Sequence, residues 1–344
     1  MRMNRIAIAP FITLLVLILA ISTSPIACEP MEKIRVIVTA PVLKSVVKAV
    51  GGDLVEVKSI LPPGVDPHSY EPSIEDVVKT VSNASLIVMT GPHHLPIEEK
   101  IEKLAEEGLI KVPMINYEDY EVTGLTILKI PETGAENPHG YFYSISGLKA
   151  IAKACAIKLS KIDPRKSEQF EKNLEEYLQR LTALEERIAY MRVSGEKIIL
   201  GGPILQYLAE DLDLEIVDII VPAHGLEPSS KDISEAIQLV RGGKAQLVII
   251  SDREAAEYPA LIKAFRENEV PFAIVPVIEL SDTPELLPLV TASLLKSNLH
   301  ESLIKYSSST SFADAILMPS LIANLVLAIF VILLLIKVRR YGGS

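Results

Sequence analysis

The chain has 344 residues, of which 49% are hydrophobic, and a formal net charge of −10 with an isoelectric point of about 5.3. This acidic balance argues against nucleic acid as a partner, because a phosphate-binding surface needs an excess of Lys and Arg. The absence of Trp and an aromatic content of 5% disfavour a stacking site for sugars or bases. The length allows two ordinary domains, and we expect a small polar ligand.

Residues 1–28 have the order of a secretory signal peptide. Arg2 and Arg5 precede an apolar run, and small residues follow it. Cys28 offers an alternative as a lipidation site, although Pro25 stands where such sites usually carry an aliphatic residue. The other cysteine, Cys155, lies in an apolar helical pattern and is predicted to be a small buried residue, so no disulfide framework is expected.

The stretch 33–163 is predicted to form one α/β lobe. Short apolar runs at 34–39, 54–60, 86–90 and 111–115 alternate with helical patterns. Such alternation is typical of a parallel sheet with helices on both faces. The last helix of this lobe is expected to start near residue 146.

Residues 164–192 are predicted to form one long amphipathic helix. Apolar residues recur at spacings of four and three, at Phe170, Leu174, Tyr177, Leu181, Leu184 and Ile188. A dimeric coiled coil is the alternative, but the repeat is shorter than three heptads. A helix of about 28 residues is roughly 42 Å long, enough to connect two lobes rigidly.

Residues 196–300 resume the alternation of the first lobe. Strands are predicted at 198–200, 214–221, 245–251 and 272–277, and the last helix at 284–299. The predicted fold class is α/β, with two lobes that each hold a roughly four-stranded parallel sheet flanked by helices. Ligands of such folds bind at the carboxyl ends of the strands, so we expect a binding crevice between the lobes.

The C-terminal part has the pattern of a membrane anchor. Residues 315–336 carry no charge and are long enough to cross a bilayer as a helix. The basic cluster in 337–344 marks the cytoplasmic side. We therefore expect a stalk over 301–314, a transmembrane helix over 315–336 and a cytoplasmic tail. The expected location is the cell membrane, with a single span and both lobes extracytoplasmic.

Two of the six histidines follow a proline at a loop-to-helix junction of the first lobe. His68 lies in the proline-rich loop 61–76, and His139 follows Pro138. Proline fixes its own φ and restricts the preceding residue, so such loops hold an imidazole in place. Imidazoles with one or two carboxylates suit zinc, manganese or iron, whereas two cysteines are too few for a thiolate site.

His93 and His94 follow the strand predicted at 86–90 and offer two further imidazoles for the same crevice; a solvated loop is an equally good interpretation. The sequence has no GxxxxGK[ST] loop, no GxSxG elbow and no HExxH motif. The chain is therefore not expected to hydrolyse nucleotides itself.

Three short motifs carry a family resemblance. The sequence GVDPHSYEP at 64–72, followed by Asp76, resembles the signature of the solute-binding proteins of ABC transporters for zinc and manganese, the cluster A-I metal receptors. NPH at 137–139 and EPS at 227–229 match two further motifs, and the resemblance covers about residues 33–300. It implies an extracytoplasmic receptor, not an enzyme, that captures a divalent zinc or manganese ion between two lobes. It also implies delivery to a membrane permease powered by a separate ATPase.

The resemblance implies two metal ligands from each lobe. His68 and His139 correspond to the first-lobe pair. The second-lobe positions fall on Pro203 and Val275, whose side chains cannot bind a metal. Candidate replacements lie near strand ends or loops of that lobe, and the sequence does not select among them: His224, Glu227, Asp252 and Glu279.

Two alternatives stay open beside the receptor. One is an exported zinc hydrolase with two histidines, a carboxylate and an open coordination position. The other is an adhesion or sensory ectodomain that keeps the fold with a decayed metal site. For the receptor, binding through neutral imidazoles predicts that metal affinity falls below about pH 6.5.

Overall fold

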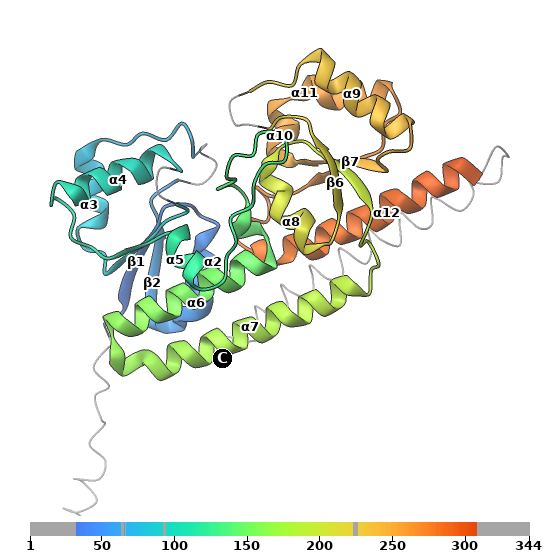
Figure 1. Ribbon diagram of the computed structural model, residues 1–344. Coiled ribbons are helices and arrows are strands. Elements are labelled where there is room, and N and C mark those ends of the chain that lie inside the picture. The colour runs from blue at the N-terminus through green and yellow to red at the C-terminus, as the bar shows by residue number, and fades with distance from the viewer. Residues whose placement is uncertain (1–31, 63–64, 66, 92–93, 223–225, 308–344) are drawn as a thin grey trace, which may run out of the picture.

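The computed structural model describes residues 32–62, 65, 67–91, 94–222 and 226–307 (Figure 1). The predicted signal peptide with Cys28, part of the predicted stalk, the predicted transmembrane helix at 315–336 and the tail lie outside the described residues. Within the described ranges, no helix is long and apolar enough to cross a membrane.

The first lobe contains a parallel sheet with the strand order β2-β1-β3-β4. Its strands are β1 (Ile34–Val38), β2 (Val55–Ser59), β3 (Leu86–Val88) and β4 (Met114–Ile115). Its helices are α2 (Leu43–Gly51), α3 (Ile74–Val81), α4 (Pro96–Glu106), α5 (Tyr117–Val122) and α6 (Ile145–Ile162). The predicted alternation of short strands and helices is confirmed for this sheet.

Both faces of the first sheet are covered, because successive strand residues point to opposite sides. Val36 and Val38 belong to the core that includes α2 and α6, whereas Ile37 packs in a separate cluster with α3 and α4. Fully buried strands of a parallel sheet are therefore continuously apolar. Cys155 on α6 is buried as predicted, and burial raises the pKa of its thiol to about 12.

The second lobe repeats this architecture with the strand order β6-β5-β7-β8, again all parallel. Its strands are β5 (Lys197–Leu200), β6 (Glu215–Ile219), β7 (Leu247–Ser251) and β8 (Phe272–Val275). Its helices are α8 (Gln206–Asp211), α9 (Ser230–Arg241), α10 (Asp252–Glu257), α11 (Pro259–Glu267) and α12 (Leu287–Ser307). The α/β class with two four-stranded parallel sheets is therefore confirmed.

The long helix between the sheets is α7 (Ser167–Ala189), which is shorter than the predicted 164–192 because residues 164–166 form a 3-10 turn. It runs beside α6 and contacts α12, so it touches helices of both lobes (Figure 1). One hydrophobic core continues from the first lobe through α6 and α7 into α8 and α12. Helix α12 ends at Ser307 rather than 299, since no Gly or Pro interrupts it there.

Candidate metal centre

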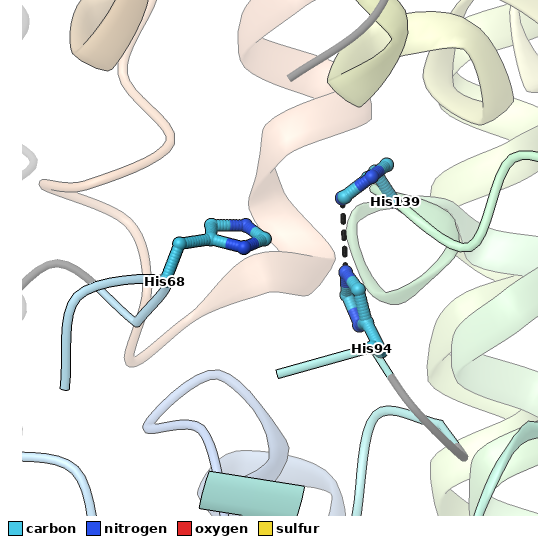
Figure 2. Close-up of side chains that lie close together, drawn as sticks. All are labelled: His68, His94 and His139. Carbon is cyan, nitrogen blue, oxygen red and sulfur yellow. Dashed lines mark hydrogen bonds between the residues drawn. The ribbon is translucent and has the colours of Figure 1, made fainter. Parts of the chain in front are cut away.

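Three imidazoles meet beside the first sheet. His68 follows β2, His94 follows β3, and His139 precedes the 3-10 turn that leads into α6. Figure 2 shows the three rings directed toward one another. One nitrogen atom from each ring lies within 4.8 Å of the other two, and all three side chains are partly buried. The structure therefore brings together the two predicted histidines and adds His94.

The spacing of the nitrogen atoms suits a transition metal. Zinc bound tetrahedrally at 2.0–2.1 Å places neighbouring ligand atoms roughly 3.3 Å apart. The Nε2 atom of His94 and the Nδ1 atom of His139 are 2.9 Å apart and share a hydrogen bond (Figure 2). A metal ion would replace the proton between these two atoms. His68 lies somewhat further away, with its ring centroid 5.7 Å from that of His139.

A buried hydrogen-bond network holds His94. Its Nδ1 atom is 2.7 Å from the Oγ1 atom of Thr90, and that hydroxyl lies 2.9 Å from the Oε2 atom of Glu98. The Thr90 backbone N–H and the Thr39 hydroxyl donate to the other carboxylate oxygen. Glu98 is 0% exposed, and desolvation raises the pKa of its carboxyl to about 7.

Asn137 holds the backbone before His139 against the second lobe. Its Oδ1 atom accepts from the His139 backbone N–H at 2.9 Å. Its amide group donates to the Pro203 carbonyl and to Gln206 Oε1, each at 2.9 Å. The Tyr207 hydroxyl in turn donates to the Asn137 carbonyl at 2.6 Å. The segment that carries His139 is therefore bonded to the start of α8.

Gly140 makes this contact between the lobes possible. Its φ of +85° lies in the left-handed region, and a Cβ atom there would lie 1.9 Å from the Ile204 carbonyl oxygen. Any other residue would therefore push the two backbones apart. The next residue, Tyr141, donates its hydroxyl to the Thr90 carbonyl. The same short segment thus joins the second lobe to the loop that carries His94.

The three histidines line a cavity of about 620 Å³ between the lobes, as predicted for two such sheets. A second hollow beside His68 and His139 is lined by second-lobe residues, among them Pro203, Ser251, Arg253, Glu254, Glu257 and Tyr258. Arg253 and Glu257 line both hollows. The second lobe therefore presents charged side chains from α10 to the histidines.

The two carboxylates on α10 have different environments. Glu254 accepts from the backbone N–H and the hydroxyl of Ser251, both at 2.9 Å, as part of a capping box. Desolvation raises the pKa of Glu254 to about 7. Glu257 is exposed and accepts from the Tyr258 hydroxyl at 3.0 Å. Neither glutamate was predicted from the sequence as a site residue, although Ser251-x-x-Glu254 is the pattern that starts a helix directly after β7.

The predicted second-lobe candidates lie elsewhere. The Asp252 carboxylate accepts from the Ile278 backbone N–H at 3.1 Å and does not join the histidine cluster. Glu227 and Glu279 are exposed and absent from the described lining of both hollows, and His224 lies outside the described residues. At the two expected family positions, Pro203 lines the smaller hollow, while Val275 is 0% exposed in the core.

Curated relatives share sequence with this chain. The manganese ABC transporter substrate-binding lipoprotein PsaA of Streptococcus pneumoniae is 31% identical over 204 residues, which are 57% of this chain and 64% of the relative. The metal ABC transporter substrate-binding lipoprotein ScbA of Streptococcus cristatus is 34% identical over 176 residues, 48% and 54% of the two chains. The chain thus spans about 54% to 64% of the length of these relatives.

Solved structures share the fold. The substrate-binding protein FpvC of Pseudomonas aeruginosa in complex with Ni²⁺ superposes with a TM-score of 0.65 at 23% identity, over 79% of this chain and 98% of that one. A crystal structure of ZnuA gives a TM-score of 0.63 at 22% identity, over 77% and 100%. At these identities the likeness shows the two-lobed architecture alone.

These comparisons correct the predicted location. We expected a single-pass membrane protein held by the helix at 315–336, with its C-terminus in the cytoplasm. The relatives are instead named lipoproteins. By this comparison the location predicted from the C-terminal hydropathy is wrong. An uninterrupted apolar run shows that a segment is long and apolar enough to cross a membrane, but it does not show how the protein is attached to the membrane.

The family model described as zinc-uptake complex component A, periplasmic, matches residues 36–281. This range holds both sheets, α7 and all three clustered histidines. The chain belongs to this ZnuA family of metal-binding periplasmic proteins.

Proposed function

We propose that this protein is the extracytoplasmic substrate-binding receptor of an ABC importer and that it captures a divalent metal ion, zinc in preference to manganese. The observation that carries the proposal is the cluster of His68, His94 and His139 in the cleft between the lobes. Family membership and the names of the relatives support the receptor role. The predicted signal peptide at 1–28 provides for export.

The donor set favours zinc. Three imidazole nitrogens suit zinc, copper or nickel, whereas manganese prefers carboxylate, carbonyl and water oxygens. The second-lobe carboxylate that faces the cleft, Glu257, shares its surroundings with the cation Arg253, which weakens the attraction for a hard metal ion. Solvent or a second-lobe group would fill the remaining coordination position.

Capture and delivery follow from the position of the cluster. The metal ion would bind beside the loops that follow β2 and β3 of the first sheet, and the second lobe would cover it from the other side. We propose that a membrane permease, powered by a separate ATPase, then receives the ion, as the family implies. His139 belongs to the segment bonded to α8, so movement of the lobes would pull this ligand away from His68 and His94.

The test is a competition titration of the purified protein against a chromophoric chelator, with zinc and with manganese. Wild type should bind zinc at least about 100-fold more tightly than manganese, because the donors are nitrogen atoms. His68→Ala and His139→Ala should each lose most of the zinc affinity, while Glu227→Ala, the matched control on the exposed loop before α9, should keep it. Equal binding by all four proteins contradicts the site.

A second candidate function is a zinc hydrolase, because three histidines with one open position also form catalytic zinc sites. This reading needs a general base beside the metal. Esterase and peptidase assays on the zinc-loaded protein separate the two: turnover that disappears in His94→Ala supports the hydrolase, and zinc binding without turnover supports the receptor.

A further inference from the structure

We propose that Glu98 is a positioning residue that acts through the Thr90 hydroxyl to keep His94 in the tautomer whose Nε2 atom can bind a metal ion. The inference deepens the proposed function and rests on it for the identity of the ligand. Glu98 lies on the first turn of α4 and Thr90 just beyond the end of β3, so the network links two elements of the first lobe.

The direction of each hydrogen bond follows from the number of protons. The Thr90 hydroxyl has one proton and two neighbours, Glu98 Oε2 at 2.9 Å and His94 Nδ1 at 2.7 Å. Above a pH of about 7 the Glu98 carboxyl is ionised and can only accept, so Thr90 donates to Glu98. The hydroxyl oxygen then accepts from His94, which places the imidazole proton on Nδ1. The Nε2 atom of His94 is left unprotonated.

That unprotonated atom is the one directed at the other ligands. Nε2 of His94 lies 2.9 Å from Nδ1 of His139, and both belong to the cluster with His68. A metal-bound histidine typically donates its other ring N–H to a fixed acceptor, which orients the ring and raises its basicity. Thr90, backed by Glu98, is such an acceptor for His94.

A purely structural role does not require a carboxylate here. The Thr39 hydroxyl and the Thr90 backbone N–H both bond to Oε1, and a glutamine oxygen would accept from them equally well. The second oxygen is where the two side chains differ, because a glutamine would donate there. The first oxygen also lies 3.0 Å from the Thr90 hydroxyl, but its two lone pairs are taken by the Thr39 hydroxyl and the Thr90 N–H. The amide donor would therefore direct the Thr90 proton toward His94 Nδ1 and so move the imidazole proton to Nε2. Burying an ionised carboxylate at 0% exposure costs free energy unless hydrogen bonds compensate its charge.

The experiment compares wild type with Glu98→Gln, Thr90→Val and Thr90→Ser. Zinc affinity is measured by chelator competition, and the tautomer of His94 by ¹⁵N NMR of the metal-free protein, both at about pH 8, above the pKa of Glu98. Glu98→Gln and Thr90→Val should each lower zinc affinity about 10- to 100-fold, the usual effect of removing a partner of a metal ligand. Thr90→Ser keeps the hydroxyl and should retain wild-type affinity. In Glu98→Gln the imidazole proton of His94 should move from Nδ1 to Nε2, with no fall in the unfolding midpoint.

Unchanged zinc affinity in Glu98→Gln, or a His94 tautomer that is the same in both proteins, overturns the inference. Loss of affinity together with a lower unfolding midpoint assigns Glu98 a structural role and also overturns it. Failure of the wild type to bind zinc is a different result, since it removes the proposed function. The NMR comparison uses metal-free protein and still decides whether Glu98 controls the tautomer.

Discussion

The two sides of the cleft are built from the same kind of lobe but differ in chemistry. The first sheet directs three imidazoles to one point, and hydrogen bonds from Thr90 and Asn137 hold two of them. The second sheet presents a mixture of charges from α10, with a proline and a buried valine at the two expected ligand positions. Two lobes with the same fold therefore need not contribute equally to the binding of a ligand. We propose that the affinity for a cation is concentrated on one side and that the other side serves mainly to cover it.

The largest expected effect comes from removing an imidazole on the first side. His94→Ala should lower zinc affinity on the order of 1,000-fold, about 4 kcal/mol, because a bond to the metal ion is lost. His93→Ala is the matched comparison, because it removes the neighbouring imidazole in the sequence, which lies outside the described residues. Chelator competition measures both variants. A larger loss in His93→Ala than in His94→Ala would reverse the assignment.

The buried carboxyls of Glu98 and Glu254 allow the two sides to be compared through the pH dependence of the unfolding free energy. The pKa of Glu98 is raised to about 7 from an ordinary value of 4.5, so its contribution to stability is full below about pH 4.5 and is lost as pH rises through 7. We expect about 3 kcal/mol of unfolding free energy to be lost over this range, and Glu98→Gln to remove that part of the pH dependence. Glu254, partly buried on the second side, should act in the same direction and no more strongly.

Urea unfolding of the metal-free protein at several pH values checks this expectation. When the unfolding free energy of each Gln variant is subtracted from that of the wild type, the contributions of the other titrating groups cancel. The difference therefore reports on one carboxyl alone. A wild type that gains stability relative to the Gln variant as pH rises from 4.5 to 7 has the opposite sign and contradicts the environment assigned to the carboxyl.

A smaller effect is expected where the two sides join. Asn137 is 0% exposed and bonds to His139, Pro203 and Gln206. Asn137→Ala removes these three buried hydrogen bonds and should cost about 2 kcal/mol of unfolding free energy. It should also weaken zinc binding, because the backbone before His139 loses its support. Asn173→Ala on α7, whose side chain bonds to the Val50 carbonyl, is a control for loss of an amide far from the cleft.

The smallest effect is expected on the second side. Glu257→Gln removes the exposed carboxylate that lines both hollows, and an exposed charge is screened by solvent. Zinc affinity should therefore fall at most about 5-fold. A loss as large as that of His94→Ala would show that α10 supplies a direct ligand, and the two sides would then contribute equally.

The sequence predicted the fold more completely than the site. Continuous apolar runs and intervening helices identified both parallel sheets, because burial on both faces leaves a clear pattern. His68 and His139 were found through the rigid Pro-His dipeptides. His94 was not selected, because a Gly-Pro-His-His stretch does not reveal which ring turns inward. The buried Glu98 that supports it is eight residues from Thr90, and only the packing of α4 on the sheet brings them together.

The sequence could not select among the second-lobe candidates for a related reason. Asp252 was chosen because it follows a strand, yet the helix begins at this residue and its carboxylate accepts from the Ile278 backbone instead. The start of α10 decides which of its residues face the cleft, and a shift of one residue rotates a helix by about 100°. The capping residues Ser251 and Glu254 fix the residue at which α10 begins. The prediction of second-lobe ligands did not take them into account.

X-ray absorption spectroscopy of the zinc-loaded wild-type protein tests the central claim most directly. The claim is that the first side supplies three imidazole ligands. The spectrum should show three imidazole nitrogens at about 2.0 Å with the multiple scattering of histidine rings, and one further light donor. In His94→Ala the number of imidazoles should fall to two. Two imidazoles with two carboxylates in the wild type would contradict the claim and place half of the site on the second lobe.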